Sequence, residues 1–469
     1  MKKFILVTGC WFLVAYSFGQ TISQKLQKAY QQFESDSQLK HAISSLYVID
    51  AKTGDVVFDK NSQIGLADAS TQKIITATTA FELLGKDYRY KTEFGYDSKV
   101  YEGVLNGNLY VTGSGDPTFG SWRYTSTNEE KIFTDISNAV LKKGIKKING
   151  DILIKTLMWQ SQAIPDGWIW QDIGNYYGTG AIGLNWRENQ FDLIMQSGDK
   201  IDEPIKITNT IPELLYQTKF ISEVKSAAKG TGDNAYIYLP LNSQEKYVIG
   251  TIPVGESAFK ISGAMTNPDG QFVYSLQKKL AQFVVMRNFD AYGKIPQFDE
   301  KSLTNVVQFY THYSPSLDSI IYWFLKKSIN LYGEALIKTF AYEKKGFGST
   351  DSGVVIVKDF WKQRGIDENE LNIHDGSGLS PLNRVTTHAQ VEILKYAKTK
   401  DWFLYFYDAL PEFNGMKMKS GTISDVKAFC GYQTAKDGKE YIFSFIVNNY
   451  NGRTSELVNK MYRVLDNLK

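Results

Sequence analysis

The sequence predicts an α+β fold built on an antiparallel sheet to which both chain ends contribute. Near the N-terminus, "ISSLYVIDAKTGDVVFDKN" places two runs rich in β-branched and aromatic residues around "AKTGD". This pattern predicts a strand, a tight turn and a strand. Near the C-terminus, "MKMKSGTISDVKAFCGY" and "EYIFSFIVNNY" predict strands joined by the turn "AKDGK". The final stretch predicts a helix, because apolar residues recur at helical spacing at Leu457, Met461, Val464 and Leu468.

The length and composition indicate a globular protein of several domains. The chain has 469 residues, of which 43% are hydrophobic and 22% are charged. A chain of this length suggests two or three domains. The long middle of the sequence is therefore expected to hold helices and inserted domains.

The N-terminal segment "MKKFILVTGCWFLVAYSFGQ" has the pattern of a secretory signal peptide. Two lysines precede an apolar run over residues 4–18, and small residues stand before Gln20. We therefore expect residues 1–19 to be removed on export. Too few apolar residues precede Cys10 to favour a lipoprotein signal. The run is short for a membrane span and no other segment approaches the required length, so no stable span is expected.

Export would leave an almost neutral chain with a single cysteine. Removing residues 1–19 takes away two lysines and no acids, so the formal charge falls from +3 to +1. Such a charge gives no general attraction to nucleic acid or anionic lipid, so no nucleic-acid partner is expected. Cys430 alternates with Val426 and Ala428 in a predicted strand, which favours a buried structural thiol.

The stretch "ADASTQKIITATTAFELLG" contains a candidate nucleophile, Ser70, with Lys73 three residues later. Residues 70–84 fit a helix with an apolar stripe at Ile74, Ala77, Phe81 and Leu84. Asp68 is a candidate N-cap, and Gly85 a candidate C-terminal stop. A lysine one turn after a serine can accept its proton, provided burial keeps the amine neutral. The spacing alone is weak, because it recurs at Ser37, Ser197, Ser222, Ser226, Ser243, Ser275 and Ser424.

Other classes of active site find little support. The chain has four histidines, and none forms an H-E-x-x-H pair. The sequence also lacks a G-x-S-x-G elbow, a G-x-x-x-x-G-K-[ST] loop and a G-x-G-x-x-G fingerprint. Metal, nucleotide and histidine-based serine hydrolase chemistry are therefore disfavoured, and neither a metal nor a cofactor is expected.

Three short motifs follow one another in the order S-x-x-K, S-x-N and K-[ST]-G: "STQK" at 70–73, "SIN" at 328–330 and "KSG" at 419–421. On these residues the chain resembles the D-Ala-D-Ala carboxypeptidase/endopeptidase family among the low-molecular-mass class C penicillin-binding proteins. The resemblance extends to "GDPTF" at 115–119, "WIWQDIGNYYG" at 168–178, "LNWRENQF" at 184–191 and "DGSGLSPLNRVT" at 375–386. It implies a β-lactamase/transpeptidase-like domain with two inserted domains. The stretches "VLNGNLYVTGSGDP" and "KKINGDILIK" resemble hairpin and strand material, which favours β-rich insertions. The catalytic domain would comprise residues 20–86 and 265–469, and the insertions residues 87–264.

Two further matches to the short motifs (decoys) occur in the sequence, and three residues differ from the pattern of the family. "STN" at Ser126 is a second S-x-N, and "KTG" at Lys52 is a second K-[ST]-G. Lys52 precedes the nucleophile and falls in a predicted hairpin turn, so we assign it a structural role. Isoleucine stands inside the second motif, and Asp68 stands where many relatives have proline. Pro381 replaces an arginine of some relatives, which bears on recognition of diaminopimelate.

The resemblance implies a serine-type DD-peptidase that cleaves between two D-alanines through an acyl-enzyme on Ser70. Lys73 would be the general base, Ser328 the proton relay and Asn330 the positioning residue. The N–H groups of Ser70 and Thr422 would form the oxyanion hole. The residues expected to act in catalysis are Ser70, Lys73, Ser328, Asn330 and Lys419. Those expected to bind substrate are Ser420, Gly421, Thr422, Asp172 and Tyr177.

The same resemblance implies a periplasmic enzyme that acts on peptidoglycan peptides and is inhibited by β-lactam antibiotics. Two alternatives stay open. A β-lactamase would share the motifs but would release hydrolysed penicillin rapidly. A non-catalytic cell-wall binding protein would not need the intact Ser70, Lys73 and Lys419.

Overall fold

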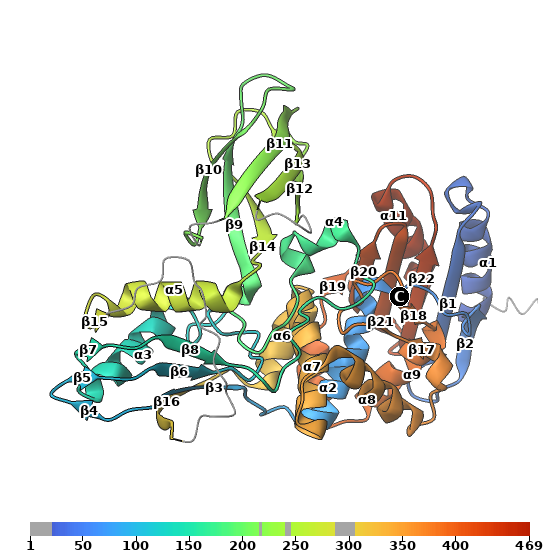
Figure 1. Ribbon diagram of the computed structural model, residues 1–469. Helices are drawn as coiled ribbons and strands as arrows, with labels where there is room; N and C mark the ends of the chain where they lie inside the picture. Colours follow the sequence, from blue (N-terminus) through green and yellow to red (C-terminus); the bar gives the residue numbers. More distant parts are fainter. Residues whose placement is uncertain (1–20, 215–217, 240–244, 287–304) are drawn as a thin grey trace, which may run out of the picture.

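The computed structural model describes residues 21–214, 218–239, 245–286 and 305–469. The predicted signal peptide at 1–19 and Cys10 lie outside these residues. Figure 1 shows three parts: a body formed by both chain ends, an elongated unit beside it, and an upright unit of strands above them.

The body is built on a six-stranded antiparallel sheet in the order β19-β20-β21-β22-β1-β2. The strands are β1 (Ile43–Asp50), β2 (Val56–Lys60), β19 (Glu412–Phe413), β20 (Met416–Ile423), β21 (Val426–Thr434) and β22 (Glu440–Asn448). Strand β1 pairs with β22 along its whole length, from Ile43 opposite Asn448 to Asp50 opposite Tyr441. The prediction that both chain ends build one sheet is confirmed.

The turn between β1 and β2 is stabilised by its own side chains. The Asp50 carboxylate accepts hydrogen bonds from the backbone N–H groups of Lys52 (2.8 Å) and Thr53 (3.0 Å). Gly54 has a φ of +79°, a conformation that glycine adopts without steric cost. Lys52 is exposed in this turn, which agrees with the structural role assigned to it.

Helices cover both faces of the sheet, which explains why its central strands are almost wholly buried. On one face, α1 (Ile22–Glu34) and α11 (Thr454–Leu465) share a core with the strands, and Leu457, Met461, Val464 and Leu468 are all buried there. On the other face lie six helices. They are α2 (Lys73–Leu84), α6 (Leu317–Lys326), α7 (Asn330–Lys345), α8 (Thr350–Lys362), α9 (Thr387–Lys398) and α10 (Phe403–Ala409).

Helix α2 lies inside this layer and is buried all round. Every residue from Lys73 to Phe81 is buried, so the apolar stripe predicted from the sequence covers only part of the buried surface. The helix begins later than predicted, because Ala69–Gln72 form a 3-10 turn that carries Ser70. Asp68 does not cap the helix with its side chain, since its carboxylate accepts a hydrogen bond from Gln390 instead (2.9 Å). Gly85 ends the helix as predicted, with a φ of +80°.

The elongated unit combines two four-stranded sheets with two helices. One sheet has the order β16-β3-β6-β8 and the other β15-β7-β5-β4. Its strands are β3 (Lys91–Tyr96), β4 (Val100–Tyr101), β5 (Val104–Leu105), β6 (Leu109–Thr112), β7 (Lys147–Ile148), β8 (Ile152–Lys155), β15 (Val285–Met286) and β16 (Val307–Tyr313). Helices α3 (Glu129–Lys142) and α5 (Pro268–Leu280) pack apolar side chains into the same core.

Two features of this unit differ from the sequence-based expectation. The unit is mixed rather than β-rich, because α3 and α5 supply much of its core. The expected boundary at residue 264 also divides residues that the structure holds together, since β16 pairs with β3 and α5 packs against α3. We propose residue 313, where β16 ends, as the limit of the added segment.

The upright unit consists of two three-stranded sheets in the orders β10-β9-β14 and β11-β13-β12. Its strands are β9 (Gln190–Gln196), β10 (Lys206–Ile211), β11 (Lys219–Ala227), β12 (Asn234–Tyr238), β13 (Glu245–Pro253) and β14 (Phe259–Ala264). The short helix α4 (Trp170–Ile173) contacts β12. Within the described part of the chain, no helix combines the length and apolar character needed to cross a bilayer.

Candidate active site

A cavity of about 530 Å³ opens beside Ser70, where the body, α4 and the upright unit meet. Six of the predicted site residues line it: Ser70, Ser328, Asn330, Thr422, Asp172 and Tyr177. Lys73 and Lys419 are buried, with exposed fractions of 0% and 2%. The fold thus brings the three motifs together around one cavity. The decoy Ser126 is exposed and lies outside this lining.

Lys73 is the centre of a buried hydrogen-bond network. Its Nζ donates to Ser70 Oγ (2.9 Å), Asn330 Oδ1 (2.6 Å) and the Ser377 carbonyl (2.6 Å). Burial lowers the pKa of Lys73 from 10.5 to about 7, although nearby carboxylates oppose the shift. An amine with this pKa is substantially neutral near pH 7, so it can accept the Ser70 proton.

Three buried carboxylates surround this lysine: Asp375, Glu334 and Asp68. Burial raises the pKa of Glu334 to about 8, and it holds the pKa of Asp68 well above its ordinary value. Glu334 lies one turn beyond Asn330 on α7 and accepts a hydrogen bond from the Gly376 N–H (3.1 Å). Because their pKa values are raised, Glu334 and Asp68 carry less negative charge near Lys73. They therefore stabilise the protonated form of the Lys73 amine less.

Asp375 fixes the conformation of the loop at residues 375–380, which contacts the turn that carries Ser70. Its carboxylate accepts hydrogen bonds from the N–H groups of Gly378 and Ser380, both at 2.7 Å. It also accepts from the side chains of Gln72 (3.0 Å), Trp168 (2.9 Å) and Asn383 (3.0 Å). These bonds connect the loop to the turn that carries Ser70 and hold the Ser377 carbonyl against Lys73.

Ser328 and Lys419 form the second part of the site. Ser328 follows α6 with a φ of +57°, a left-handed conformation that is uncommon for a non-glycine residue. Its Oγ accepts a hydrogen bond from Lys419 Nζ (3.0 Å), which also donates to the Ser420 carbonyl (2.7 Å). Burial holds the pKa of Lys419 well below 10.5, and the neighbouring Lys73 and Lys427 lower it further. A carboxylate entering the cavity would favour the protonated form of this lysine.

The third motif ends in a glycine, Gly421, because a side chain at this position would clash with the backbone. A Cβ at this position would lie 2.6 Å from the Asp68 carbonyl oxygen and 2.9 Å from the Ser70 nitrogen. Both are backbone atoms, so strand β20 can approach the turn that carries Ser70 only without a side chain. Beside it, Thr422 lines the cavity and accepts a hydrogen bond from Lys427 Nζ (2.8 Å).

Asp172, on α4, and Tyr177, in the turn that follows it, line the cavity together. Their side chains are hydrogen bonded, and partial burial raises the pKa of Asp172 despite that bond. The Tyr177 carbonyl accepts a hydrogen bond from Asn330 Nδ2 (2.8 Å), which connects this part of the cavity to the second motif. Pro381, which replaces an arginine of some relatives, also lines the cavity.

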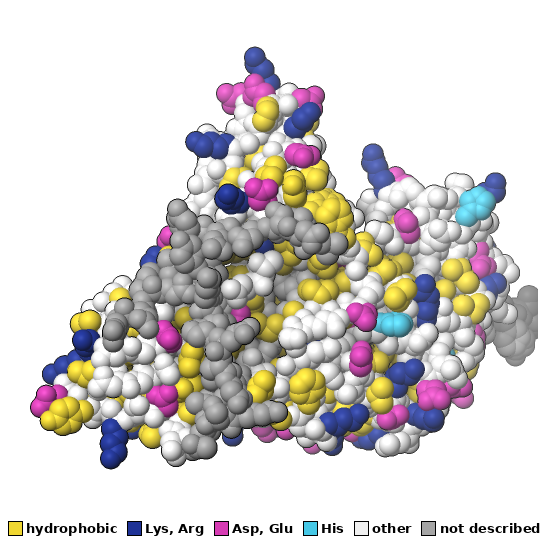
Figure 2. Space-filling model, viewed as in Figure 1, with side chains coloured by type: hydrophobic (Ala, Val, Ile, Leu, Met, Phe, Trp, Pro, Cys, Tyr) yellow, Lys and Arg dark blue, Asp and Glu magenta, His cyan; other side chains and the backbone are white. Residues whose placement is uncertain are grey.

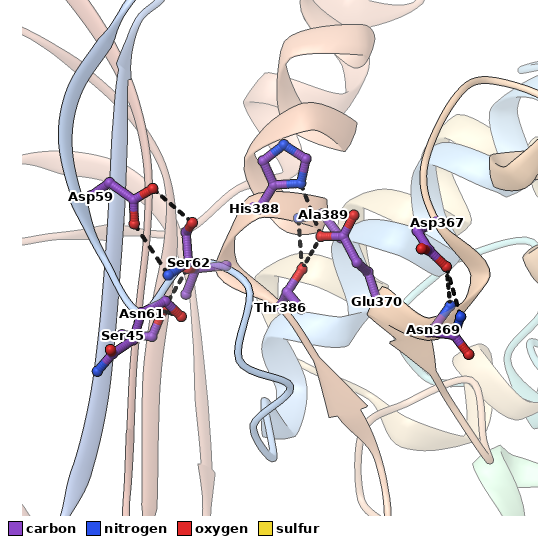
Figure 3. A network of polar contacts seen from close by, with 11 residues as sticks. Ser45, Asp59, Asn61, Ser62, Asp367, Asn369, Glu370, Thr386, His388 and Ala389 are labelled. Carbon is purple, nitrogen blue, oxygen red and sulfur yellow. Dashed lines mark hydrogen bonds and ion pairs between the residues drawn. The ribbon is translucent and has the colours of Figure 1, made fainter.

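The histidines serve other purposes. None of the four histidines lines the cavity beside Ser70. His388 lies on α9, and its Nδ1 is 2.9 Å from Glu370 Oε2, an oxygen that also accepts from Thr386 (Figure 3). Thr386 in turn caps α9 through the Ala389 N–H (3.0 Å).

Among the described residues, no group of three or more His, Cys, Asp or Glu side chains is arranged to hold a metal ion. Cys430 is buried in the core, as predicted.

Comparison with known proteins gives the family. Residues 24–412 match the D-Ala-D-Ala carboxypeptidase 3 (S13) family. The chain belongs to this family. It is 24% identical over 453 residues to the D-alanyl-D-alanine carboxypeptidase of Actinomadura sp. (strain R39), covering 89% of this chain and 80% of that protein. It is 24% identical over 428 residues to the carboxypeptidase DacB of Haemophilus influenzae, covering 87% of this chain and 85% of the relative.

Solved structures confirm the fold expected for the family. The crystal structure of penicillin-binding protein 4 (dacB) from Haemophilus influenzae superposes with a TM-score of 0.75 at 21% identity. The match covers 94% of this chain and 98% of that chain. A second structure of that protein, complexed with a novel β-lactam, gives a TM-score of 0.73 at 20% identity. The predicted family is therefore confirmed, and so is the α+β fold class of an antiparallel sheet flanked by helices with added domains.

The buried partners of Lys73 were not predicted from the sequence. Asp375 belongs to a quoted stretch, and an aspartate before Gly-Ser-Gly is a signal for a turn held by its carboxylate. Glu334 stands four residues after Asn330, which places both on the same side of a helix. No sequence signal indicated that Trp168 would donate to Asp375 from a distant segment.

Proposed function

We propose that this protein is a serine-type D-Ala-D-Ala carboxypeptidase and endopeptidase that acts through an acyl-enzyme on Ser70. The observation that carries the proposal is the contact between the hydroxyl of Ser70 and the buried Lys73, at the wall of a cavity. Family membership supplies the reaction class, because the matched family consists of D-Ala-D-Ala carboxypeptidases.

In the acylation step, Ser70 Oγ attacks the carbonyl carbon between the two terminal D-alanines while Lys73 Nζ takes its proton. The N–H groups of Ser70 and Thr422 bind the oxyanion, a kind of interaction that contributes roughly 3–4 kcal/mol in comparable sites. Ser328 passes a proton to the leaving amine, and the peptide C–N bond breaks. Water then hydrolyses the ester and releases the shortened peptide.

Substrate binding is assigned to the other motif residues. Lys419 would form an ion pair with the terminal carboxylate, with Ser420 and Thr422 beside it as hydrogen-bond donors. Gly421 supports this arrangement by allowing the strand to approach the nucleophile. Asp172 and Tyr177 would bind the side-chain amine of a diaminopimelate residue, since a half-buried carboxylate attracts a cation.

We also propose that the protein is exported and acts on peptidoglycan in the periplasm, with β-lactams as its inhibitors. The N-terminal pattern of two lysines, an apolar run and small residues supports export. Mature protein should begin near Gln20 and be recovered from the periplasmic fraction. Unprocessed protein confined to the cytoplasm would contradict this part of the proposal.

The catalytic proposal is tested by intact mass after treatment with benzylpenicillin, combined with D-alanine release from a pentapeptide ending in D-Ala-D-Ala. The wild-type chain should carry one penicilloyl ester on Ser70, and Ser70→Ala should carry none. Lys52→Ala is the matched control, because that lysine lies in an exposed turn. An adduct on another serine would contradict the assignment.

The two alternatives give different results in the same assays. Rapid release of hydrolysed penicillin without D-alanine release would identify a β-lactamase. Binding of cell-wall fragments without either reaction would identify a non-catalytic binding protein.

A further inference from the structure

Part of the outer face of the sheet β11-β13-β12 is apolar although it is not buried in a core. Side chains alternate along these strands, and Val224, Ala235, Ile237 and Val248 point into the core of the upright unit. The opposite side carries the side chains that we call the aromatic face: Ile221, Tyr236, Tyr238, Tyr247 and Ile249. A sheet face turned to solvent is ordinarily polar. An exposed apolar face of this kind indicates an interaction surface.

Strand register places these side chains in two adjacent rows. Tyr236 pairs with Ile249, and their exposed fractions are 38% and 40%. Tyr238 pairs with Tyr247, which in turn pairs with Ile221 on β11. The aromatic face is therefore one continuous surface across all three strands.

The aromatic face continues into the catalytic cavity. Tyr236 belongs to both, and Ile169, next to Trp170, also lines the cavity. The Trp170 ring lies 4.9 Å from that of Tyr238, and its Nε1 donates to the Leu239 carbonyl (2.8 Å). Trp170 is 56% exposed. Figure 2 shows hydrophobic side chains gathered at the base of the upright unit, where β12 and α4 lie in Figure 1.

The chemistry of the aromatic face fits a carbohydrate. Tyrosine and tryptophan combine an apolar ring with a polar tip, and a sugar likewise combines an apolar C–H face with hydroxyl groups. Glu223, next to Ile249 on β11, is the charged residue in these two rows. The other charged side chains on this side of the sheet, Lys219, Lys225 and Glu245, lie in the rows beyond it, so the two rows of the aromatic face offer few counter-charges to a stem peptide bearing carboxylates and amines.

The length of the stem peptide also favours a carbohydrate at this surface. A pentapeptide spans at most about 18 Å when fully extended. When its D-Ala-D-Ala end lies at Ser70, the sugar that carries it must therefore lie on a surface that adjoins the cavity. The aromatic face is such a surface. We propose that the aromatic face binds the glycan strand of peptidoglycan while its stem peptide occupies the cavity. This inference rests on the proposed function.

The test uses peptide-free glycan strands, whose binding is measured by calorimetry and which contain no bond that Ser70 could cleave. The wild-type chain should bind them, and Tyr238→Ser/Tyr247→Ser should bind at least tenfold more weakly. Tyr101→Ser is the matched control, because that tyrosine is 70% exposed on β4 in the elongated unit. It should bind like the wild type.

A second measurement compares kcat/KM for D-alanine release from a disaccharide-pentapeptide and from the free pentapeptide. The wild type should prefer the sugar-bearing substrate, and the double variant should lose the preference while reacting with benzylpenicillin at the wild-type rate. If the double variant fails to react with penicillin, Ile249→Thr replaces it, because threonine preserves the strand preference of this position.

The outcomes separate this inference from the proposed function. Equal kcat/KM for the two substrates, together with no binding of glycan strands, would overturn the inference while leaving the peptidase intact. Binding of glycan strands without any D-alanine release would support the aromatic face and refute the peptidase. A dimer in sedimentation experiments that the double variant abolishes, with glycan binding unchanged, would assign the face to a second copy of the chain.

Discussion

The buried position of Lys73 predicts a steep dependence of acylation on pH. A lysine with a pKa of about 7 is about 90% neutral at pH 8 and about 1% neutral at pH 5, so acylation should slow about ninety-fold across this range. An exposed lysine at 10.5 would be only about 0.03% neutral at pH 7. The sign follows from the mechanism, because only the neutral amine can accept the Ser70 proton.

The assay is the second-order rate of benzylpenicillin acylation, followed by stopped-flow or by intact mass, at constant ionic strength. Penicillin keeps its carboxylate ionised over this range, so the profile reports on the enzyme. A rate that changed by less than about threefold between pH 5 and pH 8 would refute the general-base role of Lys73. A Lys73→Ala variant that kept the wild-type profile would refute it equally.

Glu334→Gln provides a matched control for the cause of the pKa. The charged groups that act on Lys73 are Asp375, Glu334 and Asp68, which raise its pKa, and Lys419, which repels it. Glutamine preserves the shape of Glu334 but cannot ionise. Because burial raises the pKa of Glu334 to about 8, this side chain is mostly neutral between pH 5 and pH 7, and the profile of the variant should stay close to that of the wild type there. A clear move to lower pH would show that Glu334 is ionised and acts on Lys73 through its charge.

Three further results are expected. Gly421→Ala should slow penicillin acylation at least about tenfold and lower the free energy of unfolding in urea by about 1–3 kcal/mol. The reason is that the new Cβ would lie 2.6 Å from a backbone oxygen. Unchanged acylation would show that β20 can move away. Asp172→Asn should reduce turnover of diaminopimelate-containing muropeptides more than acylation by penicillin, and an equal loss of both would indicate misfolding instead. The hydrogen bond to Glu370 raises the pKa of His388 above 6.5 in the folded protein. The stability that this hydrogen bond adds is therefore fully present below pH 6.5, and it is lost as the pH rises through the pKa of the folded protein. The unfolding free energies of wild type and His388→Asn should therefore differ more at pH 5.5 than at pH 9, and a constant difference would exclude this coupling.

The sequence predicted best what depends on neighbouring residues. The β1–β2 turn, the spacing of Ser70 and Lys73, and the end of α2 at Gly85 all follow from local rules, and the structure contains them. The sheet shared by both chain ends was also predictable, because its strands have clear turn signals.

What could not be predicted depends on contacts between distant segments. Gln72, Trp168 and Asp375 meet at one carboxylate, and no periodicity in the sequence relates them. Helices α3 and α5 were a different case, since their apolar residues do recur at helical spacing. α3 falls inside the insertions that were expected to be β-rich, and α5 falls after their expected end at residue 264.

The pairing of β1 with β22 also sets the order in which this protein can fold. β1 ends at Asp50 and its partner begins at Glu440, so the central sheet cannot close until almost the whole chain is available. Contacts so far apart in sequence carry a large loop-closure cost and form slowly. A nascent chain would therefore remain open during synthesis, the state in which a polypeptide can be threaded across a membrane. Chains truncated before β22 should lack the closed sheet on which α9 packs, and with it part of the framework that places Ser70 beside Lys73.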